Sequence, residues 1–295
     1  MEVRQLQIFC ILAEELNFTR TAERVHTVQS NVTTQIKALE EELGTPLFDR
    51  LAKRVVLTEA GRIFLPYAQK ALVSMNEGYY AVRHGSEPAG SLRIGAPESV
   101  LAYRLPEVLQ EFRKRYPKVE LAFRPYWDES IVNALESGKL DMAIRMVDAV
   151  SHSQCASVRL RTEKVHLIAH PEHVLAAKRV VEPEDIAGQG LLLTEAGCAY
   201  RKKLDELLAV RQIKPASITE FSSVEAVKQC ARAGMGIGLL PEIVVAAELS
   251  GNQLKSLNWA GPDINIATHI VWHKDKWPSA GMQAFLDVLK EKLQA

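Results

Sequence analysis

The stretch FTRTAERVHTVQSNVTTQIKALEEELGTPLFDR, residues 18–50, decides how the rest of this chain is understood. It predicts a short helix over 20–25, a turn, and a second helix over 29–43. The second helix carries an apolar stripe at helical spacing: Val32, Ile36, Leu39 and Leu43. Gly44 and Pro46 end it, because glycine readily takes the left-handed conformation after a helix and proline does not continue one.

The other face of the second helix is crowded with short polar side chains. The ones nearest its start are Gln29, Ser30, Asn31, Thr33 and Thr34. Amides can pair with adenine edges in a major groove, and threonine offers a hydroxyl and a methyl group. The plainer alternative is the exposed face of an ordinary helix. We expect this helix to read double-stranded DNA, which makes the chain a sequence-specific DNA-binding protein.

The net charge of the chain gives little support to DNA binding. The formal net charge is +0, and residues 1–60 hold more Asp and Glu than Lys and Arg. DNA binding must therefore rest on a few placed groups. Residues 51–58, LAKRVVLT, predict a short hairpin with two cations at its tip, either a wing resting on phosphates or a solvated turn. The remaining candidate DNA contacts are Thr19, Arg20, Lys37, Arg50, Lys53 and Arg54. Thr19 is also expected to cap the first of the two helices.

A long helix is predicted after the hairpin, over 59–83, with Thr58 as its cap. Its apolar positions recur every three or four residues: Ala60, Phe64, Tyr67, Ala71, Met75, Gly78 and Val82. Such a stripe is typical of a helix that pairs with a second copy of itself. Pro66 within it predicts either a kink or a local adjustment of the helix geometry. The GSEPAG run at 85–90 indicates a linker.

Residues 91–295 alternate between strands and helices, which predicts an α/β fold. The expected strands are 92–95, 119–126, 140–145, 164–170, 191–194, 217–221, 236–240 and 265–273. The expected helices are 104–116, 128–136, 199–208, 224–233 and 279–293. We expect two lobes, with the chain crossing between them near 162 and 267. The predicted domains are 1–58, a linker helix and hinge over 59–88, and 89–295. Within the last, lobe I comprises 89–161 and 268–295, and lobe II comprises 162–267.

Ligands of open α/β sheets bind beyond the carboxyl ends of strands, where helix N-termini point. The candidate ligand-binding residues at these ends are Pro97, Glu98, Ser99, Val100, Arg145, Thr194, Ala196, Cys198, Arg201, Phe221, Ser222 and Ser223. Arg145 and Arg201 could clamp a carboxylate, although Arg201 fits a structural ion pair equally well. Glu98 would repel an anion, and fits an amino group or a pair with Arg145. Arg201 could also lower the pKa of Cys198 and create a redox-active thiol.

Several other classes of protein are disfavoured. The N-terminus does not resemble a signal peptide, and no stretch is long and apolar enough to span a membrane, so we expect a cytoplasmic protein. The four cysteines lack metal-ligand spacing, and we expect neither a metal nor a cofactor. The eight histidines form no nucleophile–base pattern that would indicate an enzyme. The glycines at 234–238 precede a strand, so they do not form a dinucleotide loop. Residues 91–295 alone would also suit a solute-binding protein.

These motifs together resemble the LysR-type transcriptional regulators over essentially the whole chain. The matching segments are LQIFCILAEELNFTRTAERVH, VQSNVTTQIKALEEELGTPLFDR, VVLTEAG, GSLRIGAPES, LDMAIR and FSSVEAVKQCARAGMGIGLLPE. The resemblance implies a winged helix-turn-helix, a dimerising linker helix and two periplasmic-binding-protein-like lobes around an effector cleft. It also implies a homotetramer, a dimer of dimers, on promoter DNA at the nucleoid. A small and often anionic effector and RNA polymerase are the further partners it suggests.

The chain departs from the usual family pattern at the start of the second helix. Many members read Ser-Gln-Pro-Ala-Val-Ser where this chain has VQSNVT at 28–33. Val28 cannot cap a helix with its side chain, so Thr27 is expected to do so and to shift the helix start. Thr34 stands where a basic residue is common. Phosphate contacts are therefore expected to rest more on the cations at 37, 50, 53 and 54.

Overall fold

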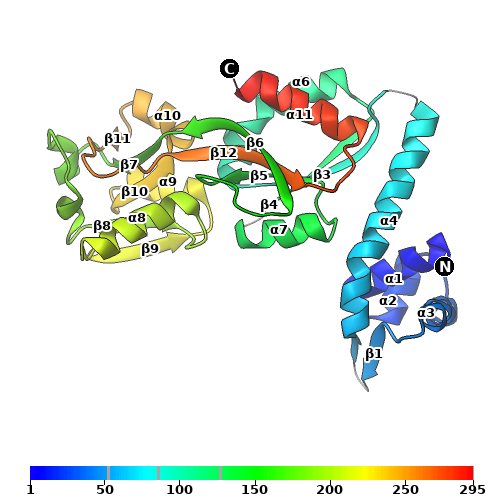
Figure 1. Cartoon of the computed structure of the whole chain (residues 1–295). Coiled ribbons are helices and arrows are strands. Elements are labelled where there is room, and N and C mark those ends of the chain that lie inside the picture. The colour runs from blue at the N-terminus through cyan, green and yellow to red at the C-terminus, as the bar shows by residue number, and fades with distance from the viewer. Residues whose placement is uncertain (52–53, 85–86, 126–127, 295) are drawn as a thin grey trace.

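The computed structural model of the chain describes residues 1–51, 54–84, 87–125 and 128–294 (Figure 1). A small helical unit with a two-stranded wing lies at one end of a long helix, and two α/β lobes follow it. Lobe I lies beside the upper part of the long helix, and lobe II lies farther away. This arrangement confirms the predicted fold class.

The N-terminal unit contains three helices and a hairpin. They are α1 (Val3–Glu15), α2 (Phe18–Arg24), α3 (Gln29–Leu43), β1 (Phe48–Leu51) and β2 (Arg54–Leu57). The α3 stripe packs against α1, and Val32, Ile36 and Leu39 are fully buried. Phe9 of α1 joins this core to the wing, with its ring centroid 5.5 Å from that of Phe48. Burial of the stripe leaves the polar side of α3 facing outward.

Two predicted helix caps are wrong. Asn17, not Thr19, caps α2, and its side chain accepts a hydrogen bond from the Arg20 amide at 3.1 Å. Thr27 does not cap α3, which begins after Val28 with no side-chain cap. The Thr27 hydroxyl instead accepts from Asn31 Nδ2 at 2.9 Å. The helix start therefore keeps its register without the usual capping bond.

The long helix α4 spans Glu59–His84 and begins as expected, with Thr58 Oγ1 accepting from the Gly61 amide at 2.9 Å. It continues through Pro66 as a single helix (Figure 1). Its first turns pack on the N-terminal core through Phe64 and Leu65. Other apolar side chains of α4 are exposed to solvent: Ile63, Tyr67, Met75, Tyr79 and Val82. Of the predicted stripe, Tyr67, Met75 and Val82 belong to this exposed face, whereas Ala60 and Phe64 pack on the N-terminal core.

Lobe I is built on a five-stranded sheet in the order β4-β3-β5-β12-β6. The strands are β3 (Gly90–Ala96), β4 (Val119–Pro125), β5 (Met142–Met146), β6 (Cys155–Glu163) and β12 (Ile266–His273). Its helices are α5 (Glu98–Tyr103), α6 (Leu105–Arg115), α7 (Asp128–Glu136) and α11 (Ala280–Leu293). Because β3, β4 and β5 are parallel, their carboxyl ends share one edge of the sheet.

Lobe II is built on a second five-stranded sheet in the order β11-β7-β10-β8-β9. The strands are β7 (Val165–Ala169), β8 (Gly190–Thr194), β9 (Ser217–Phe221), β10 (Ile237–Pro241) and β11 (Lys255–Ser256). Its helices are α8 (Ala199–Val210), α9 (Val224–Arg232) and α10 (Glu242–Ser250), with short turns η1 (Val174–Ala177) and η2 (Pro183–Ile186). The carboxyl ends of the parallel strands β8, β9 and β10 lie at one edge.

Six elements of the lobes were not predicted: α5, β6, α10, β11 and the short 3₁₀ turns η1 and η2. Short helices and edge strands carry weak periodicity, and β6 takes its register from pairing with β12, which includes a shift between Thr268 and His269. The helix expected over 104–116 corresponds to α6. A separate short helix, α5, precedes it. The chain passes from lobe I to lobe II between β6 and β7 and returns at β12.

Candidate DNA-binding face and effector cleft

The start of α3 presents the predicted polar face to solvent. Gln29, Ser30, Thr34 and Lys37 are exposed. Thr34 Oγ1 donates to the Ser30 carbonyl at 3.0 Å, and Thr33 Oγ1 donates to the Gln29 carbonyl at 3.1 Å. These hydroxyl protons are therefore used within the helix. Each threonine can still offer lone pairs to a base amino group and a methyl group to thymine.

Helix α2 supports this face from its own exposed side. Thr19 Oγ1 donates to Gln29 Oε1 at 3.3 Å and links the two helices. Arg20 is exposed on the same helix. Asn31 is half-buried, and its amide nitrogen donates to Thr27. The two amides that the sequence singled out are thus both held by a threonine, which limits their freedom before any DNA is bound.

The wing is fixed to α3 by a residue that the sequence analysis did not single out. Glu40 Oε1 accepts from the Leu47 amide at 2.8 Å and from the Phe48 amide at 3.1 Å. Nothing in the run Glu40-Glu41-Glu42 distinguishes the first acid from the others except its place beside the apolar stripe. Arg54 is exposed on β2. Lys53 and the side chain of Arg50 lie outside the described residues.

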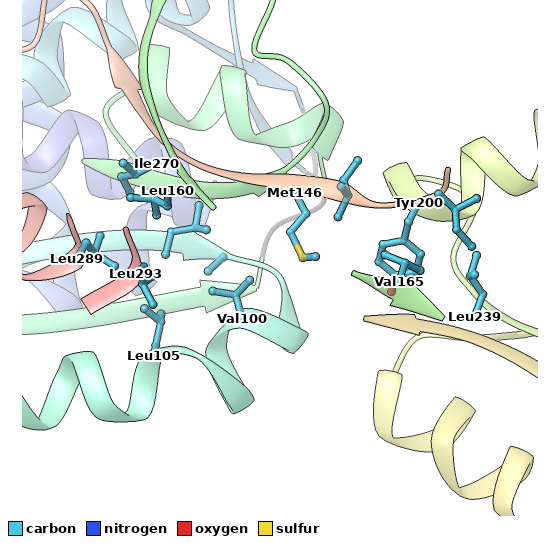
Figure 2. Packing of buried hydrophobic residues seen from close by; sticks show 14 of the residues in the cluster. Val100, Leu105, Met146, Leu160, Val165, Tyr200, Leu239, Ile270, Leu289 and Leu293 are labelled. Atoms are coloured by element: carbon cyan, nitrogen blue, oxygen red, sulfur yellow. The ribbon is translucent and has the colours of Figure 1, made fainter. Parts of the chain in front are cut away.

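Between the lobes lies a cavity of about 60 Å³, at the carboxyl ends of β3, β5 and β8 and at the N-termini of α5, α8 and α9. Seven predicted residues line it: Pro97, Glu98, Ser99, Arg145, Thr194, Cys198 and Ser222. Seven others line it that were not among the candidate ligand-binding residues: Ile131, Ile144, Met146, Gly197, Ala199, Tyr200 and Val224. Figure 2 shows Met146 on the lobe I side and Tyr200 on the lobe II side.

Five of the predicted ligand-binding residues do not line the cavity: Val100, Ala196, Arg201, Phe221 and Ser223. Val100 is buried in the core of lobe I. Arg201 is only 8% exposed, donates to the Thr194 carbonyl and forms ion pairs with Glu220 and Asp205. Of the two roles that the sequence left open for Arg201, the structure contains the ion pair. Its guanidinium fixes the end of β8 from behind the cavity.

The thiol of Cys198 is not activated in the way that the sequence suggested. Burial raises the pKa of Cys198, and the nearby Thr194 side chain and the amides at the start of α8 only partly oppose this effect. The nearby guanidinium of Arg201 is directed to carboxylates and a carbonyl instead. The predicted lowering of the Cys198 pKa is therefore wrong. A thiol that stays protonated at neutral pH is a weak nucleophile and a poor redox sensor.

Glu98 takes a position that neither sequence hypothesis described. Its carboxylate crosses from lobe I to the start of α9 in lobe II. Ser223 Oγ donates to Glu98 Oε1 at 2.9 Å, and the Val224 amide donates to Oε2 at 2.9 Å. Ser223 also caps α9, accepting from the Ala226 amide at 3.4 Å. The carboxylate lies at the positive end of a helix dipole, a favourable place for an anion.

A second polar contact joins the lobes at the far end of α5. Tyr103 donates to Glu225 Oε2 at 2.6 Å, and Lys228 Nζ donates to the Tyr103 hydroxyl at 3.1 Å. Lys228 also lies 2.9 Å from Glu225 and 3.0 Å from Glu248. The Tyr103 hydroxyl is the main cause that lowers the pKa of Glu225 to about 2. Both ends of the short helix α5 thus hold lobe II.

The comparisons with known proteins agree with this geometry. Residues 3–62 match the family model of the bacterial regulatory helix-turn-helix protein, lysR family, and residues 85–294 match the LysR substrate binding domain. The uncharacterized HTH-type transcriptional regulator YwqM of Bacillus subtilis is 42% identical, over 99% of both chains. The chain belongs to the LysR-type transcriptional regulators. It is a DNA-binding regulator with a C-terminal effector-binding domain, in a family of regulators and not of enzymes.

Solved structures of other proteins share the fold, among them CbnR, a LysR family transcriptional regulator. ArgP from Mycobacterium tuberculosis superposes with a TM-score of 0.77 at 20% identity, covering 99% of this chain and 97% of that one. Full-length CbnR, solved in complex with its target DNA, superposes with a TM-score of 0.68 at 22% identity, covering 99% and 100%. At these identities the likeness concerns the fold and carries no residue roles.

Two features are absent from the described part of this LysR-type regulator. Among those residues, no three His, Cys, Asp or Glu side chains are grouped so that they could hold a metal ion. None of the helices described is both long and apolar enough to cross a bilayer.

Proposed function

We propose that this regulator reads its operator with the first turns of α3. The base-contacting side chains are Gln29, Ser30, Asn31, Thr33 and Thr34. The backbone-contacting side chains are Thr19, Arg20, Lys37, Arg50, Lys53 and Arg54. The observation that carries the proposal is the division of α3 into an apolar stripe, with Val32, Ile36 and Leu39 fully buried, and a polar face on which Gln29, Ser30 and Thr34 are exposed. CbnR, which shares the fold, was solved on its target DNA, and this supports the same use of the N-terminal unit.

The C-terminal domain is proposed to bind a small-molecule effector between the lobes. Ser99, Thr194, Cys198 and Ser222 bring hydroxyl and thiol groups to a cavity whose other walls are mainly apolar. Ligand pockets usually hold about 300–1,000 Å³. At about 60 Å³ the present cavity is too small for most metabolites, so effector binding requires the lobes to move. We propose the same domain limits as those expected from the sequence. They are 1–58, 59–88 and 89–295, with lobe II at 162–267.

The assembly is proposed to be a homotetramer, a dimer of dimers, held in part by α4. The exposed apolar face of α4 supports this assignment, since an isolated helix would leave Tyr67 and Val82 in water. The regulator is proposed to act in the cytoplasm, at the nucleoid, and to contact RNA polymerase at its promoters.

The test uses gel-shift titration with the intergenic DNA upstream of the chain's own gene and with random DNA of equal length. Gln29→Ala should weaken binding to the operator by roughly 5- to 150-fold, the loss of one bidentate base contact, and should leave binding to random DNA nearly unchanged. Arg54→Ala is the matched comparison. It should weaken binding to both DNAs and make binding less dependent on salt, because it removes a phosphate contact. Equal losses on both DNAs for Gln29→Ala would rule out base reading.

A further inference from the structure

The cleft of this regulator already contains a bound carboxylate, and the chain itself supplies it. Glu98 belongs to α5 of lobe I, yet both of its oxygens bond to the first turn of α9 in lobe II, each at 2.9 Å. α9 is nine residues long, and the Val224 amide is one of the groups at its start that has no partner within the helix. The amide, the Ser223 hydroxyl and the helix dipole together form a place suited to one anionic group.

A second observation places ligand chemistry at the same cavity. Thr194 closes β8 and is only 6% exposed, and it lines the cavity together with Glu98. Its Oγ1 makes no hydrogen bond of normal length and angle among the described residues, and its polar neighbours are Cys198 and Tyr200. A buried hydroxyl without a partner costs free energy, so its presence at a ligand cleft indicates a group that arrives with the ligand. The hydroxyl can donate to a second oxygen of an incoming molecule.

We propose that the N-terminus of α9 is a carboxylate-binding subsite that Glu98 occupies in the ligand-free regulator and that a carboxylate of the effector takes over. This inference rests on the proposed function, since it assigns a chemical class to the effector of that cleft. Two carboxylates cannot share one amide and one hydroxyl without strong repulsion. The incoming carboxylate therefore displaces Glu98 and removes the contact between α5 and α9. The effector's binding and the release of the lobes are then the same event.

From the sequence alone, an anionic effector is in conflict with Glu98 at the same cleft, because two negative charges repel each other. The position of Glu98 removes this conflict, because the acid marks the place where an anion is stabilised. The cavity of about 60 Å³ fits the same view, since it is the space left while Glu98 and α5 close the cleft. The Tyr103–Glu225 bond at the other end of α5 limits how far the lobes separate when Glu98 leaves.

The test is chemical rescue of full-length Glu98→Ala by acetate, read as the melting temperature. Glu98→Ala should melt below wild type, because the inter-lobe contact is lost and the start of α9 has no acceptor. Sodium acetate should raise its Tm saturably, on the order of 2–4 °C, as the free carboxylate fills the vacated subsite. Acetamide, which has the same shape without the charge, and sodium chloride at equal ionic strength should not. Wild type should not respond to acetate, because Glu98 holds the subsite.

Two variants sharpen the rescue experiment. Adding Ser223→Ala to Glu98→Ala should weaken or remove the response to acetate, because the second donor is gone. Glu107→Ala, an exposed acid in the first turn of α6, is the control and should show no response. If Glu98→Ala does not fold, Glu98→Gln replaces it and should melt below wild type.

An equal response to acetate in wild type and Glu98→Ala, or none in either, would overturn the proposal, as would Glu98→Gln melting like wild type. The assay contains no DNA and no natural effector. A negative result here would therefore not affect the gel-shift test of DNA binding. A negative gel shift would likewise not account for a saturable rescue by acetate.

Discussion

The first turns of α3 and the cleft between the lobes are both lined by short polar side chains at helix N-termini, but they are in opposite states. On α3 the polar face is exposed, and its internal bonds, such as Thr19 to Gln29, hold side chains without covering them. In the cleft, Glu98 from one lobe satisfies the helix start of the other, and little space remains. The α3 face needs to break no such contact before it binds DNA. The cleft must first break the contact of Glu98 with α9 before it binds an effector.

The difference follows from what each partner offers. DNA supplies a large, fixed array of phosphates and base edges, so a rigid and open reader loses little on binding. A small effector supplies few groups, and it can change the protein only by binding one arrangement of the lobes better than another. A cleft closed by the chain's own carboxylate provides two such arrangements. The following predictions test the two sides of this comparison.

The largest expected effect concerns the buried side of α3. Ile36 is fully buried. Ile36→Ala should lower the free energy of unfolding of the N-terminal unit by about 2–5 kcal/mol, because it removes buried surface and leaves a cavity. Thr34→Ala, on the exposed side of the same helix, should change it by less than about 0.5 kcal/mol. Urea unfolding of the full-length variants, followed by circular dichroism, measures both. Similar losses for the two variants would mean that the face of Thr34 is not free for DNA.

A smaller effect is expected where α3 holds the wing. Glu40→Ala removes the acceptor for the Leu47 and Phe48 amides and should cost about 1–3 kcal/mol in the same unfolding assay. It should also weaken binding to operator and random DNA alike, because the wing is proposed to contact the DNA backbone. Glu41→Ala is the control, since Glu41 is exposed and its only described ion pair, to Lys37, spans 3.6 Å. A loss for Glu41→Ala as large as that for Glu40→Ala would show that charge, and not the two amide bonds, matters.

These two regions also differ in how well the sequence predicted them. The face of α3 follows from helical periodicity, so residues within one helix were enough to place Thr34 opposite Ile36. The partners of Glu98 lie 125 and 126 residues away. No local pattern joins residues at that distance. The sequence could place Glu98 and Ser223 at strand ends facing one cleft, but not show that they bond to each other.

The wrong helix-cap prediction in the N-terminal unit and the open role of Arg201 in lobe II have a related cause. Thr19 and Asn17 are both good caps two residues apart, and only the backbone geometry of the turn selects Asn17. In lobe II, Arg201 had a cleft carboxylate and a structural ion pair as equal alternatives. The choice depended on Glu220 on the neighbouring strand, which the sequence offered no reason to place there. Where a side chain has several suitable partners, sequence patterns do not determine which of them it bonds to.

The smallest expected effect concerns the second contact of α5 and depends on pH. The pKa of Glu225 is lowered from 4.5 to about 2, chiefly by the Tyr103 hydroxyl, so the folded protein favours the charged form more than the unfolded chain does. For a carboxyl group with a lowered pKa, the stabilisation is complete above the unfolded pKa and is lost as the pH falls toward the folded pKa. The contribution of Glu225 should therefore be full near neutral pH and decline from about pH 4.5 toward pH 2.

Glu225→Gln tests this by the difference in melting temperature from wild type, measured from pH 7 to pH 3.5. The difference should be a degree or two near neutral pH, since Glu225 is partly exposed and water screens its pairing. It should shrink below pH 4.5, where wild type begins to lose the same interaction. Glu206→Gln is the control, because its ion pair with Lys202 spans 3.9 Å on an exposed helix face. A difference that stays constant with pH would assign the effect of Glu225 to packing, and would leave Glu98 as the one contact of α5 that depends on charge.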